Sequence, residues 1–140
     1  MAQTMISIST RGQGLYEFTH DVETFIAKSE VEFGLLTVFV RHTSCSLIIQ
    51  ENADPDVQHD LKAFFHRMVP PSDDPAMRWM RHTSEGPDDM PAHIKAALTA
   101  VSIGIPVSGG RLALGTWQGI YLFEHRQRPH RREVVLHLSV

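Results

Sequence analysis

The chain has 140 residues, a formal net charge of −3 and one cysteine. This length suits one domain of common size, the acidic balance argues against binding nucleic acid by charge alone, and one cysteine excludes an internal disulfide. The sequence has no apolar run of about 18 residues, the length that a membrane helix needs, and the opening letters MAQTMISIST lack the features of a signal peptide, so we expect a cytoplasmic protein.

The first third of the chain predicts a hairpin, a helix and two strands. Residues 5–10 and 14–20 alternate apolar and polar types on either side of the letters RGQG, which is typical of a β-hairpin. Apolar residues at helical spacing predict a helix over residues 20–30. Two segments rich in β-branched and apolar residues then predict strands, at residues 34–42 and 44–51.

The clearest helix lies between residues 54 and 70. Asp54 precedes Pro55, the order expected for a helix cap followed by the first helical position. Pro70 and Pro71 end the helix. Its apolar residues fall on a single face, and they are Val57, Leu61, Phe64, Phe65 and Met68.

The remaining residues predict a long loop, a third helix and four strands. The loop covers residues 70–88, and loops of such length are often functional. The helix starts near Asp88 or Asp89. The strands are expected at residues 102–107, 111–116, 119–125 and 132–140. This order predicts one compact α+β domain over residues 1–140, with about two to three helices and a largely antiparallel sheet or sheets of about seven to eight strands.

The letters Arg-His-Thr-Ser occur twice, beginning at Arg41 and at Arg81. An apolar strand follows the first copy and an acidic loop follows the second, so the match is not an internal repeat. We predict instead that His42, His82 and His93 meet in one pocket, within one subunit or across a subunit interface. The alternative is that each histidine makes its own local hydrogen bond.

The stretch HTSEGPDDMPAH supplies candidate metal ligands. Within twelve residues it places His82, Glu85, Asp88, Asp89 and His93. Asp89 and His93 are one helical turn apart, and two imidazoles with a carboxylate match a common catalytic metal shell. The spacing matches no standard zinc motif, and the alternative is a set of helix-capping carboxylates beside a histidine that supports them.

Acidic and amide side chains also gather where the second helix begins. Carboxylates favour helix N-termini because they offset the unpaired amides and the dipole, so this placement alone requires no ligand. Asp56 and Asp60, however, are four residues apart on one flank and could hold a metal ion or a substrate cation. The group consists of Glu51, Asn52, Asp54, Asp56 and Asp60.

Alternation along the strand that follows His42 separates its polar and apolar side chains. His42, Ser44 and Ser46 share one face, and Cys45 lies on the other with the apolar residues. We therefore expect Cys45 to be buried and chemically inert.

The letters LGTWQG and the arginines after them form the last candidate group. Glycines on both sides of Thr116, Trp117 and Gln118 indicate a bulge or a close backbone approach. Four arginines then crowd seven residues, which suits a phosphate clamp or, alternatively, a solvated hairpin tip. These arginines are Arg126, Arg128, Arg131 and Arg132.

Three segments in order carry a resemblance to a known family: HTSCSLIIQENADPDVQHDL, HTSEGPDDMPAHIKAAL, and IPVSGGRLALGTWQGIYLFEHR. From about Val38 onward, the chain resembles the YjbQ-like family, often named the secondary thiamine-phosphate synthase family. The resemblance implies a compact α+β fold, a homotrimer and a weak thiamine-phosphate synthase activity. That reaction joins a pyrimidine diphosphate to a thiazole phosphate and releases diphosphate. The alternative function is a trimer that binds a metal or a small anion without catalysis.

The residues and the resemblance together give three candidate sets. The candidate catalytic residues are His42, Glu51, Asp60, His82, Glu85 and His93. The candidate contacts to a small phosphorylated or heteroaromatic ligand are Thr43, Ser44, Asn52, Asp56, Asp89, Thr116, Trp117, Gln118, Arg126 and Arg132. The candidate ligands of a divalent metal are His42, His82 and His93. Histidines favour zinc, whereas the acidic residues favour magnesium, and the sequence leaves both open.

Overall fold

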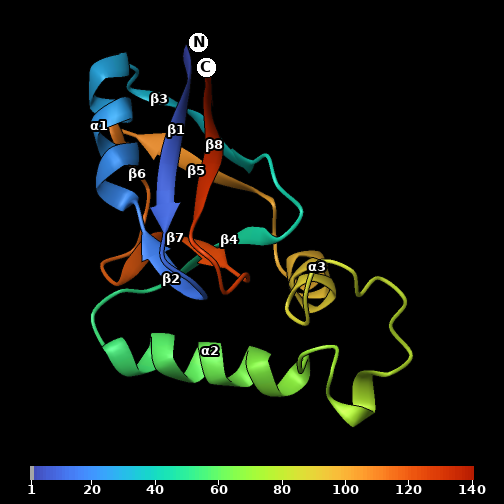
Figure 1. Cartoon of the computed structure of the whole chain (residues 1–140). Coiled ribbons are helices and arrows are strands. Elements are labelled where there is room, and N and C mark those ends of the chain that lie inside the picture. Colours follow the sequence, from blue (N-terminus) through green and yellow to red (C-terminus); the bar gives the residue numbers. More distant parts are fainter. Residues whose placement is uncertain (1) are drawn as a thin grey trace.

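Residues 2–140 of the computed structural model are described, and they form eight strands, three α-helices and one short 3-10 helix, η1 (Figure 1). This confirms the expected α+β class. The strands are β1 (Ala2–Thr10), β2 (Gly14–Glu17), β3 (Phe33–Val40), β4 (Cys45–Glu51), β5 (Ser102–Ser108), β6 (Arg111–Leu112), β7 (Gln118–Glu124) and β8 (His130–Ser139). The helices are α1 (Thr19–Ser29), α2 (Pro55–Met68), η1 (Pro75–Met77) and α3 (Asp89–Leu98).

The strands form two sheets whose neighbouring strands are all antiparallel. The five-stranded sheet has the order β1-β8-β3-β5-β6, and the three-stranded sheet has the order β2-β7-β4. β8 alternates buried and partly exposed residues, and its inward side chains Val134, Leu136 and Leu138 join the main core. α1 adds Val22 and Ile26 to the same core. Burying each of these side chains contributes about 1.5–3 kcal/mol.

The expected hairpin over residues 5–10 and 14–20 is wrong. β1 pairs with β8, and β2 pairs with β7 in the other sheet. The letters RGQG do mark a reversal, but the chain there passes from one sheet to the other. The alternation of each strand matches its distant partner, so nonlocal packing decides the pairing in place of the local turn.

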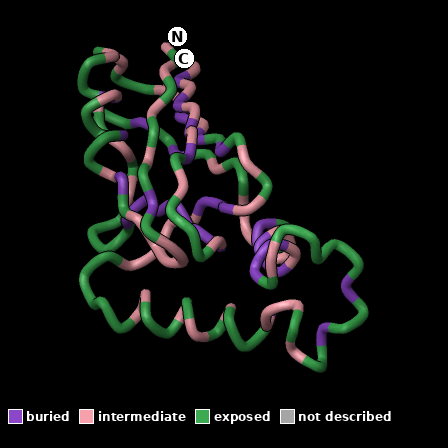
Figure 2. The backbone as a smooth tube through the Cα atoms, viewed as in Figure 1, coloured by how far each residue is buried: buried purple, intermediate pink, exposed green. Residues whose placement is uncertain are grey.

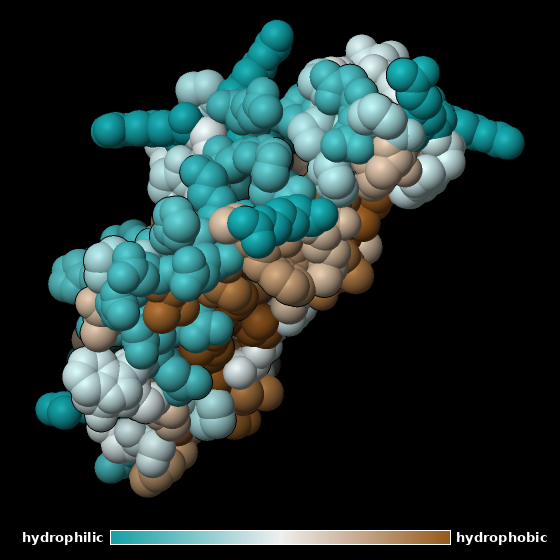
Figure 3. Space-filling model, turned by 90° about the horizontal axis from the view of Figure 1, so that it is seen from below, coloured by the Kyte–Doolittle hydropathy of each residue, from teal (hydrophilic) through white to brown (hydrophobic). Residues whose placement is uncertain are grey.

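α2 begins as its sequence predicts. The Asp54 side chain accepts a hydrogen bond from the backbone N–H of Asp56 at 2.9 Å, and Pro55 is the first helical residue. Yet no residue of α2 is buried, and Figure 2 shows the helix exposed or half-buried throughout. α2 lies at the bottom of Figure 1, and the view from below shows apolar side chains exposed among polar ones (Figure 3). Phe64 and Met68 of α2 are both exposed.

Two further expectations need correction. The strand expected at residues 111–116 is only β6, because residues 113–115 have no regular structure and residues 116–117 form a turn. The strand expected from residue 44 begins at Cys45, and His42 lies in the connection before it. The alternation of side chains along a strand therefore does not apply to His42. Ser46 and Cys45 are both buried.

No helix among residues 2–140 combines the length and apolarity that a membrane crossing requires.

Candidate metal centre

His82, Asp89 and His93 converge at the start of α3. One imidazole nitrogen from each histidine and one carboxylate oxygen all lie within 4.8 Å of one another. Asp89 and His93 face the same way because they are one helical turn apart. The loop before α3 brings His82 back against them, with the centroids of the two imidazole rings 5.4 Å apart.

Asp89 holds the two histidines together. Its Oδ2 atom lies 2.7 Å from Nε2 of His82 and 3.3 Å from Nε2 of His93. Its Oδ1 atom accepts a hydrogen bond of 2.6 Å from Nη1 of Arg126. Burial acts to raise the pKa of Asp89, but the hydrogen bond to His82 and the charge of Arg126 outweigh burial and hold that pKa below its usual range. A carboxylate that is 2% exposed therefore stays charged at neutral pH.

The hydrogen bonds of His93 determine which of its nitrogens is free. Nδ1 of His93 lies 2.9 Å from the carbonyl oxygen of Thr43, which can only accept, so Nδ1 carries the proton. In the neutral imidazole, Nε2 then presents a lone pair to the charged Oδ2 of Asp89. These two electron-rich atoms lie 3.3 Å apart, an arrangement that suits a shared metal ion. An Nδ1–H bonded to a carbonyl is also the usual support of a metal-bound imidazole.

Arg126, which the sequence assigns to an anionic ligand, ties the loop before α3 to the end of β7 and lines a hollow at the same place. Its Nε donates to Oδ2 of Asp88 at 3.0 Å, and its Nη2 donates to the carbonyl oxygen of Glu85 at 3.1 Å. These bonds, with the one to Asp89, use three of the five N–H donors of the guanidinium. The Glu85 side chain stays exposed, at the edge of a hollow of about 570 Å³ that Arg128 also lines.

His42 is not a member of the cluster. Its Nε2 atom accepts a hydrogen bond of 2.8 Å from the backbone N–H of Glu133. Burial, followed by the positive charge of Arg132, lowers the pKa of His42 and favours the neutral imidazole. Among residues 2–140, the group of convergent metal-ligand atoms therefore includes His82 and His93 but not His42. The connection that contains His42 reaches the cluster through the carbonyl oxygen of Thr43.

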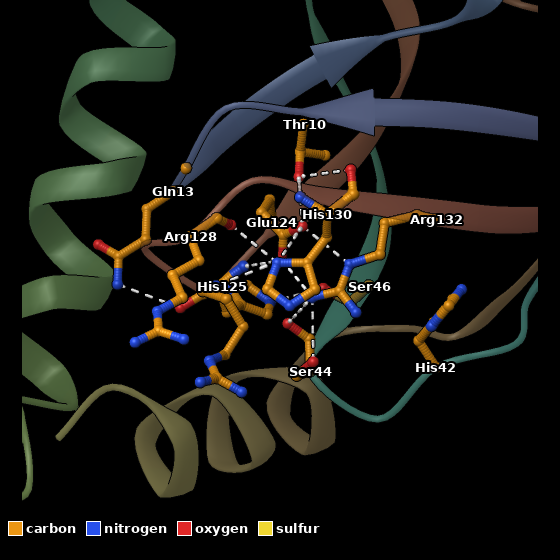
Figure 4. Close-up of polar contacts among 12 residues, drawn as sticks. Thr10, Gln13, His42, Ser44, Ser46, Glu124, His125, Arg128, His130 and Arg132 are labelled. Carbon is orange, nitrogen blue, oxygen red and sulfur yellow. Dashed lines mark hydrogen bonds and ion pairs between the residues drawn. The ribbon is translucent and has the colours of Figure 1, made fainter. Parts of the chain in front are cut away.

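Arg132, which the sequence assigns to an anionic ligand, is buried and forms an ion pair with Glu124 (Figure 4). Its Nε donates to Oε1 of Glu124 at 2.8 Å, and its Nη2 donates to Oε2 of the same carboxylate. Nη2 also donates to Oγ of Ser44 at 3.0 Å. Thr10 donates to Oε1 of Glu124 at 2.7 Å. Arg132 is 3% exposed, so its guanidinium lies inside this network.

The acidic residues around the start of α2 do not approach the histidine cluster, since this end of α2 and α3 lie on opposite sides of Figure 1. Asp56 occupies the first turn of the helix. Asp60 is exposed and lies 3.0 Å from Nδ1 of the neighbouring His59. Glu51 accepts a hydrogen bond of 3.3 Å from the backbone N–H of Asp54. Of these residues, Asp54 is the one whose side chain caps the helix.

The residues around LGTWQG line a separate cavity of about 880 Å³, which contains Asn52, Thr116 and Gln118 in its wall. The side-chain oxygen of Gln118 accepts a hydrogen bond of 2.7 Å from the backbone N–H of Gly115 and closes the turn. Trp117 does not line the cavity. Its carbonyl oxygen accepts from the backbone N–H of Asn52 at 2.9 Å, while its side chain is 62% exposed.

The sequence model of a family described as "UPF0047 protein YjbQ-like" matches residues 4–140. The chain belongs to the YjbQ-like family. It is 56% identical to UPF0047 protein sll1880 of Synechocystis sp., over 98% of this chain and 90% of that protein. It is 39% identical to UPF0047 protein YjbQ of Escherichia coli O157:H7, over 98% and 96%.

Solved structures show the same YjbQ-like fold. A conserved protein of this family from Clostridium acetobutylicum is described as uncharacterized and superposes with a TM-score of 0.86 at 34% identity, over 97% of this chain and 99% of that one. The hypothetical protein APE1520 from Aeropyrum pernix K1 superposes with a TM-score of 0.87 at 28% identity, over 99% and 98%.

His125 and Lys95 are buried polar residues of this YjbQ-like chain that the sequence patterns do not predict. His125 is 1% exposed and its Nε2 atom lies 2.9 Å from Oγ of Ser46 (Figure 4). Lys95 is buried on α3, and its charge adds to burial in lowering the pKa of His125. The letters GIYLFEH contain the one sequence feature that indicates His125, since two polar residues follow an apolar stretch without a turn residue between them. Cys45 is buried as predicted, and burial raises its pKa to about 12.

Proposed function

We propose that the protein is a cytoplasmic, metal-dependent enzyme, with a divalent metal held by His82, Asp89 and His93. The convergence of their ligand atoms within 4.8 Å carries the proposal. Two imidazole nitrogens and one carboxylate oxygen fit zinc better than magnesium, which prefers oxygen ligands. Three protein ligands leave a coordination position open, which is the usual arrangement of a catalytic zinc.

The resemblance to the YjbQ-like family supplies the reaction class, a thiamine-phosphate synthase-like transfer that releases diphosphate. A bound divalent cation would act as a Lewis acid that neutralises charge on the departing oxygens. The protein's own part is to hold the ligands: Arg126 fixes the carboxylate of Asp89, and the Thr43 carbonyl fixes the ring of His93. Arg126 and Arg132 are both paired with carboxylates, and a metal would add cationic stabilisation of diphosphate.

Zinc titration of metal-stripped protein tests the site. Wild-type protein should bind one zinc per chain, and His93→Ala should weaken binding by at least about 10- to 100-fold, the loss typical even of residues that only orient metal ligands. His59→Ala is the matched control. Like His93, His59 lies close to an aspartate oxygen, here at 3.0 Å, but it is exposed on α2. Equal zinc affinity in the wild type and His93→Ala would remove the metal centre from the proposal.

A second assay separates catalysis from binding. Diphosphate release from a pyrimidine diphosphate and a thiazole phosphate should require added zinc and should disappear in Asp89→Asn. Zinc binding without diphosphate release would favour the alternative, a protein that binds a metal or a small anion and does not catalyse this transfer.

The proposal includes assembly as a homotrimer. Phe33, Leu35 and Phe39 alternate on one face of β3 and are 63%, 48% and 44% exposed. Exposed apolar side chains grouped on a sheet face are typical of surfaces that other subunits cover. Light scattering should give three times the chain mass of 15.8 kDa, and a stable monomer at micromolar concentration would contradict the assembly.

A further inference from the structure

The cavity of about 880 Å³ lies beside the first turns of α1, away from the proposed metal centre. Its wall is formed by α1, by the chain from Gly110 to Gln118, and by Asn52, and it shares no residue with the cluster of His82, Asp89 and His93. The volume falls within the range of small-molecule sites. Leu112, Leu114 and Ile26 give it an apolar part, and polar side chains complete it.

Glu17 is a charged residue of this cavity whose side chain is held by hydrogen bonds. Its Oε2 atom accepts hydrogen bonds from Oγ1 of Thr19 at 2.8 Å and from Nδ2 of Asn52 at 3.1 Å. Thr19 is fixed in turn, because its Oγ1 accepts a hydrogen bond from the backbone N–H of Ile120 at 2.8 Å. The carboxylate also rests on the backbone of Gly119, where an added Cβ would lie 2.6 Å from Oε2. Any other residue at this position would displace Glu17.

Glu23 and His20, on the next turn of α1, line the same cavity. Within residues 2–140 neither Glu17 nor Glu23 forms an ion pair, although Arg111 is also in the wall. The cavity therefore offers two unpaired carboxylates, one of which is held in place by two donors.

We propose that this cavity binds a small organic cation with an amine, amidine or guanidine head, whose charge pairs with Glu17. A metal ion fits less well, because the one group of three convergent metal ligands among residues 2–140 is the cluster on α3. Oε2 of Glu17 already accepts two hydrogen bonds, so the cationic head would donate to Oε1. The apolar side chains of Ile26, Leu112 and Leu114 suit the carbon skeleton that such a ligand carries. The inference is independent of the proposed metal site.

Benzamidine and benzoate make a matched pair of probes, since they have similar size and opposite charge. Titrated into metal-stripped full-length protein and followed by amide chemical shifts, benzamidine should bind saturably and shift residues of the cavity wall, and benzoate should bind at least 10-fold more weakly. Glu17→Gln keeps an oxygen that accepts from Thr19 and Asn52 but loses the charge. It should weaken benzamidine binding roughly 10- to 100-fold, the range for hydrogen bonds to a charged group.

Glu32→Gln is the control variant, because Glu32 is exposed and lies outside the cavity wall. It should bind benzamidine as the wild type does. If Glu17→Gln does not fold, Glu23→Gln should weaken binding in the same direction. The proposal is overturned by equal binding of the two probes, by preferential binding of benzoate, by no saturable binding of benzamidine, or by a Glu17→Gln variant with unchanged affinity.

Discussion

Replacing Arg132 with methionine should destabilise the protein strongly, because it leaves the fully buried carboxylate of Glu124 without its cation. Removing one partner of a buried ion pair costs about 3–5 kcal/mol, most of it the penalty for the uncompensated charge. Three donors remain on Glu124, namely Oγ1 of Thr10 and the backbone N–H groups of His125 and Arg126. These hydrogen bonds partly compensate the charge of Glu124 but do not neutralise it. We therefore expect the free energy of unfolding to fall by an amount near the lower end of that range.

A double-mutant cycle distinguishes this explanation from simple loss of packing. Arg132→Met and Glu124→Gln should each destabilise, while the double variant should cost less than the sum of the two by about 0.5–3 kcal/mol, since no charge is then left buried. Urea unfolding followed by far-UV circular dichroism, at one fixed protein concentration, measures all four free energies. A loss below about 1 kcal/mol in Arg132→Met, together with loss of phosphate binding, would refute the structural role and restore the ligand contact that the sequence predicts.

Two further predictions concern pH and packing. Burial, followed by the charge of Lys95, lowers the pKa of His125 to about 3 from an ordinary value of 6.5, so the unfolded chain binds the extra proton first. The free energy of unfolding should therefore fall as the pH falls below 6.5. At pH 5 this loss should be roughly 2 kcal/mol larger in the wild type than in His125→Gln. Urea titrations that show the same pH dependence in both proteins would contradict this. Gly34→Ala places a Cβ 2.5 Å from the carbonyl oxygen of Ser139 and should lower stability by about 1–3 kcal/mol. Gly104→Ala, whose Cβ meets nothing closer than 3.6 Å, should cost clearly less in the same thermal or urea unfolding assay.

The sequence predicted the class of fold because period and composition are local properties. Helical spacing located α1 and α2, and the Asp54-Pro55 pair located the start of α2. Strand pairing is not local, so the partner of β1 could not be read from the letters RGQG. Only the complete set of strands determines which faces meet.

The candidate site was predictable where its residues lie on one helix or in the loop directly before it. Asp89 and His93 share a face of α3 by helical geometry alone, and His82 is close to them in sequence. Arg132 was assigned to a ligand because its partner Glu124 lies on a different strand, and nothing in the sequence shows that the two strands place these side chains together. A cluster of arginines therefore predicts charge at a site but not whether that charge is free.

The pairing of β1 with β8 also sets the order in which the chain can fold. β1 is an edge strand whose sole neighbour in the described sheet is β8, and every other element lies between the two in sequence. During synthesis β1 must therefore wait, with its backbone unpaired, until the residues through Ser139 have been made. Pairings of such long sequence separation are slow to form. A variant that joins residue 140 to residue 2 by a short linker and opens the chain in an exposed loop would make this pairing local, and it should fold faster with little change in the native contacts.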